Sequence, residues 1–233
     1  MAGTFVVVDF ETTGRNVRRG GGDRILGFGV AVGTLDVETG APVVKRSLSV
    51  GIRPCLMPPT TATEWRRLWN TAEWDISACN ERWIGIDNAA PRGEMAQLNA
   101  LFVPADNHHV VDTYEQAAAI LDAALREAEP YTLLVDCICF DPWLANMLLV
   151  ENGYEPISHN RDGTYRYDGT SDEDSMLAFC TDKTIPKRAR EAASPYVREH
   201  FAGTQLDAHH PRWNAVDILC RVLIEMSMLR VTQ

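Results

Sequence analysis

Two acidic residues follow a strongly apolar run near the N-terminus. The run spans residues 5–8, and Asp9 and Glu11 come directly after it, separated by Phe10. Residues two apart in a strand point to the same face, so a strand here aims both carboxylates at one spot and turns Phe10 into the core. Two like charges a few ångströms apart repel each other unless a cation lies between them. The spacing therefore indicates a divalent-metal site. The alternative is that Asp9 ends the strand and Glu11 begins a solvated turn.

The residues around this pair resemble a known motif. The string is Phe5-Val6-Val7-Val8-Asp9-Phe10-Glu11-Thr12-Thr13-Gly14. It is similar to the first exonuclease motif of the DEDD superfamily of 3′-5′ exonucleases, the DnaQ-like branch of the RNase H-like fold. The resemblance implies a second motif with a Phe-Asp pair opening a helix, and a third with an Asp on a late helix and a general base just ahead of it.

The second motif is found after another apolar run. The stretch 133–144 looks like the family's strand, short turn and helix start, and its Phe140-Asp141 is the Phe-Asp pair. The resemblance makes Asp141 a metal ligand. The alternative is a helix N-cap ahead of Pro142, a position that Asp fills well.

The third motif departs from the family's pattern. The stretch 214–219 resembles the family's late helix, which makes Asp217 the fourth carboxylate, and a lone carboxylate on an apolar helix face is costly. The general base of the family stands five or four positions before that Asp, where this chain has Arg212 and Trp213. Neither acts as a base. The nearest histidines are His210 and His209, and we expect His210 to be the base because imidazole takes up a proton near neutral pH. The alternative is a polar pair without chemistry.

The resemblance implies a specific reaction. Four carboxylates hold two Mg²⁺ or Mn²⁺ ions about 4 Å apart, and the ions activate a water and stabilise the leaving 3′ oxygen. Asp9 would bridge both ions, Glu11 and Asp217 would serve the nucleophile side and Asp141 the leaving-group side. The expected function is a 3′-5′ exonuclease that releases nucleoside monophosphates from single-stranded RNA or DNA ends. The expected contacts to the terminal nucleotide are Phe10, Thr12, Thr13 and Phe140.

The chain also loosely resembles a branch of phage exonuclease A-type and bacterial exoribonuclease-like proteins. The likeness lies in its length, in the continuation of the third motif and in a Trp-rich insertion at about 57–104. Tryptophans 65, 69 and 74 in that insertion suit base stacking or, equally, a helix core. Basic residues gather in 15–24 and 183–198, and such runs serve either a phosphate backbone or a solvated face.

A sheet and several helices must position these residues. Apolar runs predict strands over 5–10, 25–35, 43–52 and 131–136, and periodicity predicts helices over 112–129, 142–151, 172–180, 186–200 and 211–229, with one more near 63–79. Residues 158–171 are expected to form a loop or hairpin. We therefore expect one α/β domain over 1–233, with an RNase H-like mixed sheet of about five strands, the first three antiparallel, flanked by helices.

Composition narrows the class of protein. The net charge of −10 argues against holding long nucleic acid by bulk electrostatics, but a carboxylate and metal site is itself acidic. The six cysteines lack the paired spacing of a zinc ribbon and fit a reducing compartment. No apolar run approaches the roughly 18 residues of a membrane span, so a soluble intracellular protein without a membrane partner is expected. The competing hypothesis, motivated by Arg212, is a catalytically inactive nucleic-acid-binding or scaffold protein on the same fold.

Overall fold

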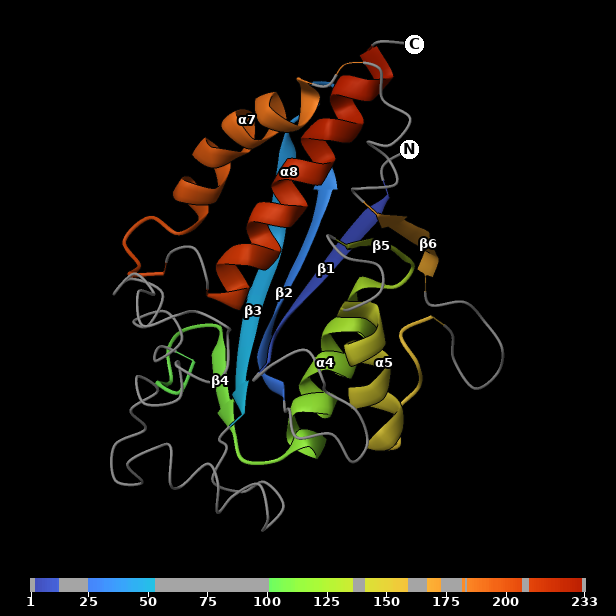
Figure 1. Cartoon of the computed structure of the whole chain (residues 1–233), viewed down its shortest axis with the longest axis vertical. Coiled ribbons are helices and arrows are strands. Elements are labelled where there is room, and N and C mark those ends of the chain that lie inside the picture. Colours follow the sequence, from blue (N-terminus) through green and yellow to red (C-terminus); the bar gives the residue numbers. More distant parts are fainter. Residues whose placement is uncertain are drawn as a thin grey trace.

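The computed structural model describes residues 3–12, 25–52, 101–135, 141–158, 167–172, 182, 184–206 and 210–231, and the account below concerns these residues. They form a mixed sheet with helices on both faces (Figure 1). The strands are β1 (Thr4–Thr12), β2 (Ile25–Leu35), β3 (Pro42–Ile52), β4 (His108–Val111), β5 (Tyr131–Val135) and β6 (Tyr167–Asp172). The helices are α4 (Tyr114–Ala128), α5 (Asp141–Glu151), α7 (Ile185–His200) and α8 (Pro211–Val231).

The sheet has the strand order β4-β3-β2-β1-β5-β6. Strands β1, β2 and β3 pair antiparallel with one another, whereas β4, β5 and β6 each pair parallel with their neighbours. The predicted α/β class with a mixed, helix-flanked sheet is therefore confirmed, and the sheet has six strands where about five were expected.

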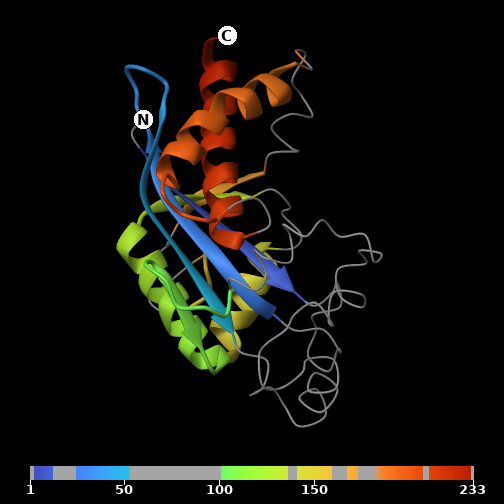
Figure 2. The same cartoon turned by 90° about the vertical axis from the view of Figure 1, so that its left-hand side faces the viewer.

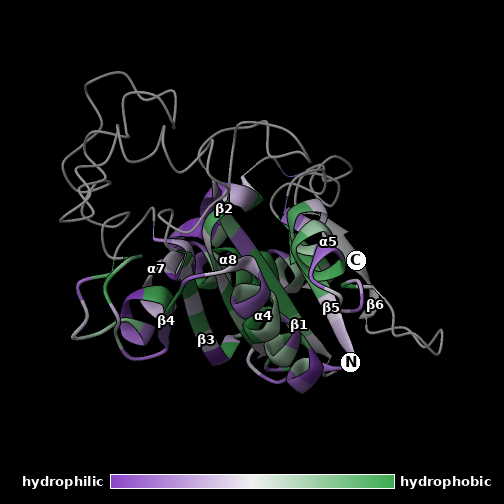
Figure 3. Cartoon of the chain, turned by 90° about the horizontal axis from the view of Figure 1, so that it is seen from below, coloured by the Kyte–Doolittle hydropathy of each residue, from purple (hydrophilic) through white to green (hydrophobic). Residues whose placement is uncertain are grey.

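Alternating residues of the strands feed two separate cores. Val6, Val8 and Phe10 of β1 pack with α4 and α5 on one face, and Phe5 and Val7 pack with α7 and α8 on the other. Figure 2 shows the sheet between these two helix layers, and Figure 3 shows apolar residues concentrated on β1 and β2. β1 lies inside the sheet, between β2 and β5, and apolar side chains are buried on both of its faces. Its two acidic residues lie near its C-terminal end.

Two glycines of β2 fix the position of α8 on the sheet. A Cβ at Gly29 would lie 2.1 Å from the carbonyl oxygen of Pro211, and a Cβ at Gly33 would lie 2.8 Å from Leu219 Cδ2. Four strand residues span about 13 Å and eight helical residues about 12 Å, so α8 runs along β2 between these two contacts. The first turn of α8 therefore lies directly over Gly29.

Some predicted elements differ from the structure. Residues 167–172, expected in a loop or hairpin, form β6, and Asp172 ends this strand rather than starting a helix. The four-residue strand β4 was not predicted. Both are short edge strands, and edge strands are often short and polar, so they lack the apolar alternation that identifies a strand in sequence. The helix expected over 112–129 begins two residues later, after Thr113 caps it through a hydrogen bond from the Gln116 backbone.

Several residues and elements that the sequence analysis predicted lie outside the described residues. These are Thr13, Phe140 and His209, the helix near 63–79 with its tryptophans, the basic run at 15–24, and all but the first residue of the helix expected over 172–180. Among the helices that the structure describes, none is both long and apolar enough to cross a membrane.

The contact between Gly29 and α8 predicts a large effect of one methyl group. Gly29→Ala places a Cβ 2.1 Å from one backbone atom of the first turn of α8 and 2.6 Å from another, the amide nitrogen of Arg212. Neither can move without shifting the helix, so we expect a loss of about 3 kcal/mol in the free energy of unfolding, the upper end of the usual range for overpacking. Urea unfolding measures it.

Gly3→Ala is the matched control, because its Cβ meets nothing closer than 4.0 Å. It should change stability by less than about 0.5 kcal/mol. Equal stability of the two variants would show that α8 does not lie on Gly29 as described.

Candidate functional site

A hydrogen bond joins the start of α5 to the end of β1. The backbone N–H of Phe10 donates to Oδ1 of Asp141 at 3.1 Å, and the bond is buried. Among the described residues, the parallel pairing of β1 with β5 ends at Val7 and Leu134, three residues before Phe10. The Asp141 carboxylate takes the place of that strand as an acceptor. Asp141 is thereby fixed against the peptide between Asp9 and Glu11.

The carboxylate of Glu11 is strongly perturbed. Burial and, as the smaller cause, the negative charge of Asp141 raise its pKa to about 8. These are the two environments that disfavour an ionised carboxyl group, namely loss of water and a like charge nearby. The Asp141 carboxylate therefore lies close enough to Glu11 to disfavour its ionised form.

Asp9 lies on the face of the sheet covered by α8. It pairs with Gly29, the residue that contacts the first turn of α8, and its Oδ2 atom is buried. By the alternation of the strand, Asp9 and Glu11 share this face with Val7, while Phe10 points to the opposite core. The expectation that the strand separates the two acids from Phe10 is consistent with this packing.

Asp217 is held elsewhere on α8. Its Oδ2 lies 3.8 Å from Nε of Arg221, one turn further along the helix. Asp217 is six residues beyond Pro211, which places its Cα about 9 Å along the helix axis from the row of Asp9 and Gly29. Its negative charge adds to burial in raising the pKa of Cys220. Asp217 therefore takes part in an ion pair on its own helix.

His210 lies on the other side of the α8 N-terminus. Its ring packs edge-on against that of His108 of β4, with ring centres 5.8 Å apart. His108, Ser49, Gly29 and Asp9 occupy one row across four adjacent strands. Three strand spacings separate His108 from Asp9, or about 14 Å. Burial lowers the pKa of His210 to about 3, with His108 and Arg212 adding to the effect. The structure does not bring His210 to the carboxylates.

Arg212 and Trp213, which stand where the resemblance led us to expect a base, have structural contacts. The Arg212 guanidinium donates to Ser47 Oγ at 2.8 Å through Nε and to the Asp106 carbonyl at 3.0 Å through Nη1. Trp213 stacks on Phe201 with ring centres 4.9 Å apart. Both residues therefore help to fix the N-terminal turn of α8 against β3 and the end of α7.

Phe10 and Thr12, which we expected to contact the terminal nucleotide, lie in different environments. The Phe10 side chain is only 6% exposed and packs against Phe28, so its ring belongs to the core rather than to a substrate surface. Thr12 is half-buried and ends β1, at an irregularity in the pairing with β2. Sequence reasoning missed His108 and its partner Ser49. The alternation of Ser47 and Ser49 with apolar neighbours is the signal that β3 presents polar groups to α8.

The donor set suits a hard divalent cation. Asp9, Glu11 and Asp141 offer carboxylate oxygens, the ligands that Mg²⁺ and Mn²⁺ prefer. Within the described ranges, no group of three or more acidic, histidine or cysteine side chains is already drawn together tightly enough to form a metal site. The residues fit such an ion by chemistry and by the proximity of Glu11 and Asp141, and Asp217 is the remaining carboxylate of the expected set.

Comparisons with known proteins do not assign a family. No family model matches the chain, and no curated protein is significantly similar to it.

The raised pKa of Glu11 predicts an unusual dependence of stability on pH. In metal-free buffer the native state holds a proton on Glu11 up to about pH 8, whereas the unfolded chain releases it near pH 4.5. The native state therefore binds more protons between these values, and the stability of the wild type falls relative to Glu11→Gln as pH rises, by up to about 1.4 kcal/mol per unit.

Urea unfolding of both proteins at pH 5, 6, 7 and 8 in EDTA measures this difference. Burial lowers the pKa of His108, His200 and His210, so stability also falls below about pH 6.5, but this loss is common to both proteins and cancels in the comparison. Parallel curves would show that Glu11 ionises normally in the folded protein.

Proposed function

We propose that this protein is a divalent-metal-dependent 3′-5′ exonuclease that releases nucleoside monophosphates from single-stranded nucleic acid. One observation carries the proposal. Asp141, 131 positions from Phe10 in sequence, bonds to the backbone between Asp9 and Glu11 and raises the pKa of Glu11. A strand end that collects buried carboxylates from separate elements is destabilised by their repulsion, and a bound cation relieves that cost.

Each carboxylate has a defined part in this proposal. Asp9, Glu11 and Asp141 would hold the ions, which when bound supply an activated water and stabilise the leaving 3′ oxygen. The hydrogen bond from Phe10 N–H fixes the orientation of Asp141 before any ion binds. A protonated Glu11 is neutral, which reduces the repulsion between the carboxyl groups and lets the protein stay folded without metal. We expect Thr12, which follows Glu11 at the end of β1, to contact the terminal nucleotide.

The proton acceptor predicted at His210 has no support from the described geometry. The ring contacts His108, and its pKa of about 3 reflects a buried neutral imidazole beside Arg212. A residue in that setting holds the N-terminal turn of α8 in place. We therefore expect His210 to affect stability more than turnover.

A second candidate function is binding without catalysis. It is favoured by the ion pair of Asp217 with Arg221 and by Arg212 at the position where the family has its base. A site that has Arg212 where a base is expected would still bind metal through its carboxylates. Metal-dependent cleavage distinguishes the two candidates.

Cleavage of 5′-labelled single-stranded RNA and DNA tests the proposal directly. With Mg²⁺ or Mn²⁺ we expect a ladder that shortens from the 3′ end and is absent in EDTA. Asp9→Asn and Asp141→Asn should each reduce the rate at least about 100-fold, because each removes a ligand charge at the reacting phosphate. His210→Ala should retain activity within about tenfold at a temperature where it is folded.

Glu38→Gln is the matched control, since it removes an exposed carboxylate from the turn between β2 and β3. It should cleave at the wild-type rate. Intact labelled strands under every metal condition, together with retained strand binding, would favour the second candidate. Loss of activity in His210→Ala equal to that in Asp9→Asn would return the base role to His210.

A further inference from the structure

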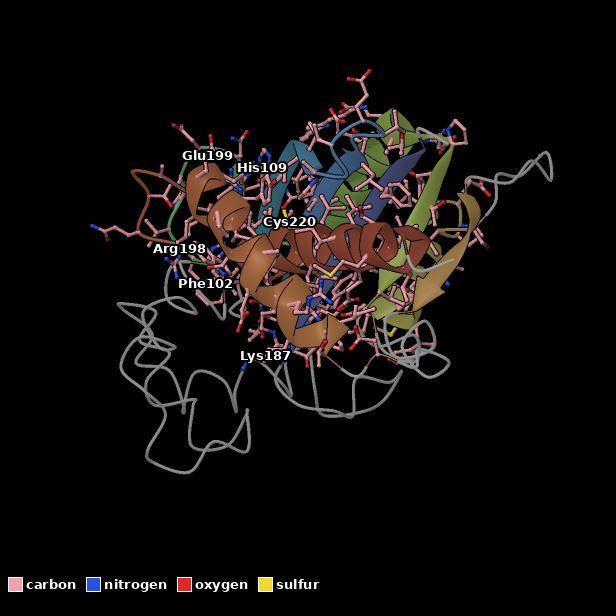
Figure 4. All side chains as sticks on the ribbon, turned by 90° about the horizontal axis from the view of Figure 1, so that it is seen from above. Phe102, His109, Lys187, Arg198, Glu199 and Cys220 are labelled. Atoms are coloured by element: carbon pink, nitrogen blue, oxygen red, sulfur yellow. The ribbon has the colours of Figure 1, made fainter. Side chains whose placement is uncertain are left out.

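A pocket of about 460 Å³ opens beside the N-terminus of α8, on the β4 side of the sheet. Its walls come from the 103–108 segment, the 204–206 segment after α7, and the first residues of α8. Figure 4 shows the end of α7, at Arg198 and Glu199, beside the segment that carries Phe102 and His109. Its volume is in the range that small-molecule sites occupy. None of the carboxylates of the candidate metal site lines it.

The pocket is lined by a ring nitrogen of His210. Nδ1 of His210 accepts a hydrogen bond from the backbone N–H of Arg212 at 3.2 Å, so a neutral ring carries its proton on Nε2. No acceptor for Nε2 is present among the described residues, and this nitrogen is not one of their fully buried, unpartnered atoms. The Nε2–H group therefore reaches the open pocket, where it can donate to a ligand.

His108 provides the contrast. Its Nε2 donates to the carbonyl of Leu101 at 2.9 Å, and its Nδ1 accepts from the Ser49 hydroxyl at 2.7 Å. Both ring nitrogens are therefore satisfied within the protein. His210 differs from this neighbour in having one nitrogen left for the pocket.

Arg212 makes the same pocket positive. Its side chain is 9% exposed, and its partners among the described residues are a hydroxyl, a carbonyl and the ring of Phe201. No carboxylate lies within ion-pair distance of it in the described part of the chain, whereas the other buried arginine, Arg221, has Asp217. Burial lowers the pKa of Arg212, and the nearby charge of Asp106 offsets this only in part, so an anion in the pocket would supply the ion pair that Arg212 lacks among these residues.

The surrounding charges agree with an anion. The N-terminal turn of α8 presents the positive end of a 21-residue helix to the pocket. The one acidic side chain in the lining is Asp106, which is exposed and therefore screened by water. Apolar side chains of Val103 and Leu206 complete the walls, which suits a ligand that carries an uncharged body next to its charge.

We infer that this pocket binds the phosphate of a nucleotide, held by His210 Nε2–H, the Arg212 guanidinium and the N-terminus of α8. The choice of a nucleotide rests on the proposed function, and the anion site itself does not. The bound phosphate belongs either to a free nucleoside monophosphate or to an internal position of a single-stranded nucleic acid, and both present the same phosphate chemistry. The row from Asp9 to His108 is about 14 Å long, and the first turn of α8 lies over it at Gly29, between the two sites.

Equilibrium dialysis in EDTA with AMP, inorganic phosphate and adenosine tests the inference without any contribution from bound metal. We expect AMP and phosphate to bind and adenosine not to bind. Arg212→Gln should weaken AMP binding at least about tenfold, since it removes a charge-assisted hydrogen bond. Tighter binding of a 3′-blocked trinucleotide than of AMP would identify the strand as the source, and equal binding would identify the free nucleotide.

Asn107→Asp guards against a folding defect in the Arg212 variant. Asn107 is exposed, lines the pocket and has a φ of 56°, which Asp also tolerates. Its added negative charge should weaken AMP binding several-fold without unfolding the protein. Lys45→Gln, on the exposed surface of β3, changes the net charge equally and should bind AMP as the wild type does.

Asp9→Asn should also bind AMP normally, so loss of nuclease activity and loss of the anion site are distinguishable. Failure of the wild type to bind AMP, phosphate and the trinucleotide would overturn the inference. Wild-type affinity in both Asn107→Asp and Arg212→Gln would overturn it as well.

Discussion

The hydrogen bond from the Phe10 backbone to the Asp141 carboxylate is the constraint on which the candidate site depends. The bond lies beyond the pairing of β1 with β5, which ends at Val7 and Leu134 in the described part of the chain. Asp141 satisfies the Phe10 amide by placing its charge next to Glu11, and burial together with this charge raises the pKa of Glu11 to about 8. The backbone of the sheet is thus completed at an electrostatic cost, and that cost is what a divalent cation would remove.

A second constraint is the close approach of α8 to Gly29. It sets the first turn of the helix between Asp9 on one side and His108 on the other, along a single row of the sheet. Residues at the start of α8 therefore divide between two environments. Arg212 and His210 lie toward β4 and its pocket, and Asp217 lies further along the helix with Arg221. One helix position accounts for both the pocket and the separation of His210 from the carboxylates.

The sequence predicted the three long strands well, including the strand that carries Asp9, because β1, β2 and β3 are apolar runs bounded by turn residues. The closeness of Asp141 to β1 followed from a resemblance and not from spacing, because a hydrogen bond across 131 positions leaves no local pattern. The position of His210 was not predictable in the same way. Its ring direction depends on a close approach between Gly29 and Pro211, and on a four-residue edge strand that carries His108.

Calorimetric titration of the metal-free protein with Mn²⁺, for the wild type and Asp141→Asn, tests the central claim most directly. Asn keeps an oxygen that accepts from Phe10 N–H but removes the charge beside Glu11. The account predicts that the wild type binds Mn²⁺ and releases protons at pH 7, and that the variant binds at least about tenfold more weakly. Undiminished binding by the variant, or no binding by the wild type, would contradict a metal site at this strand end.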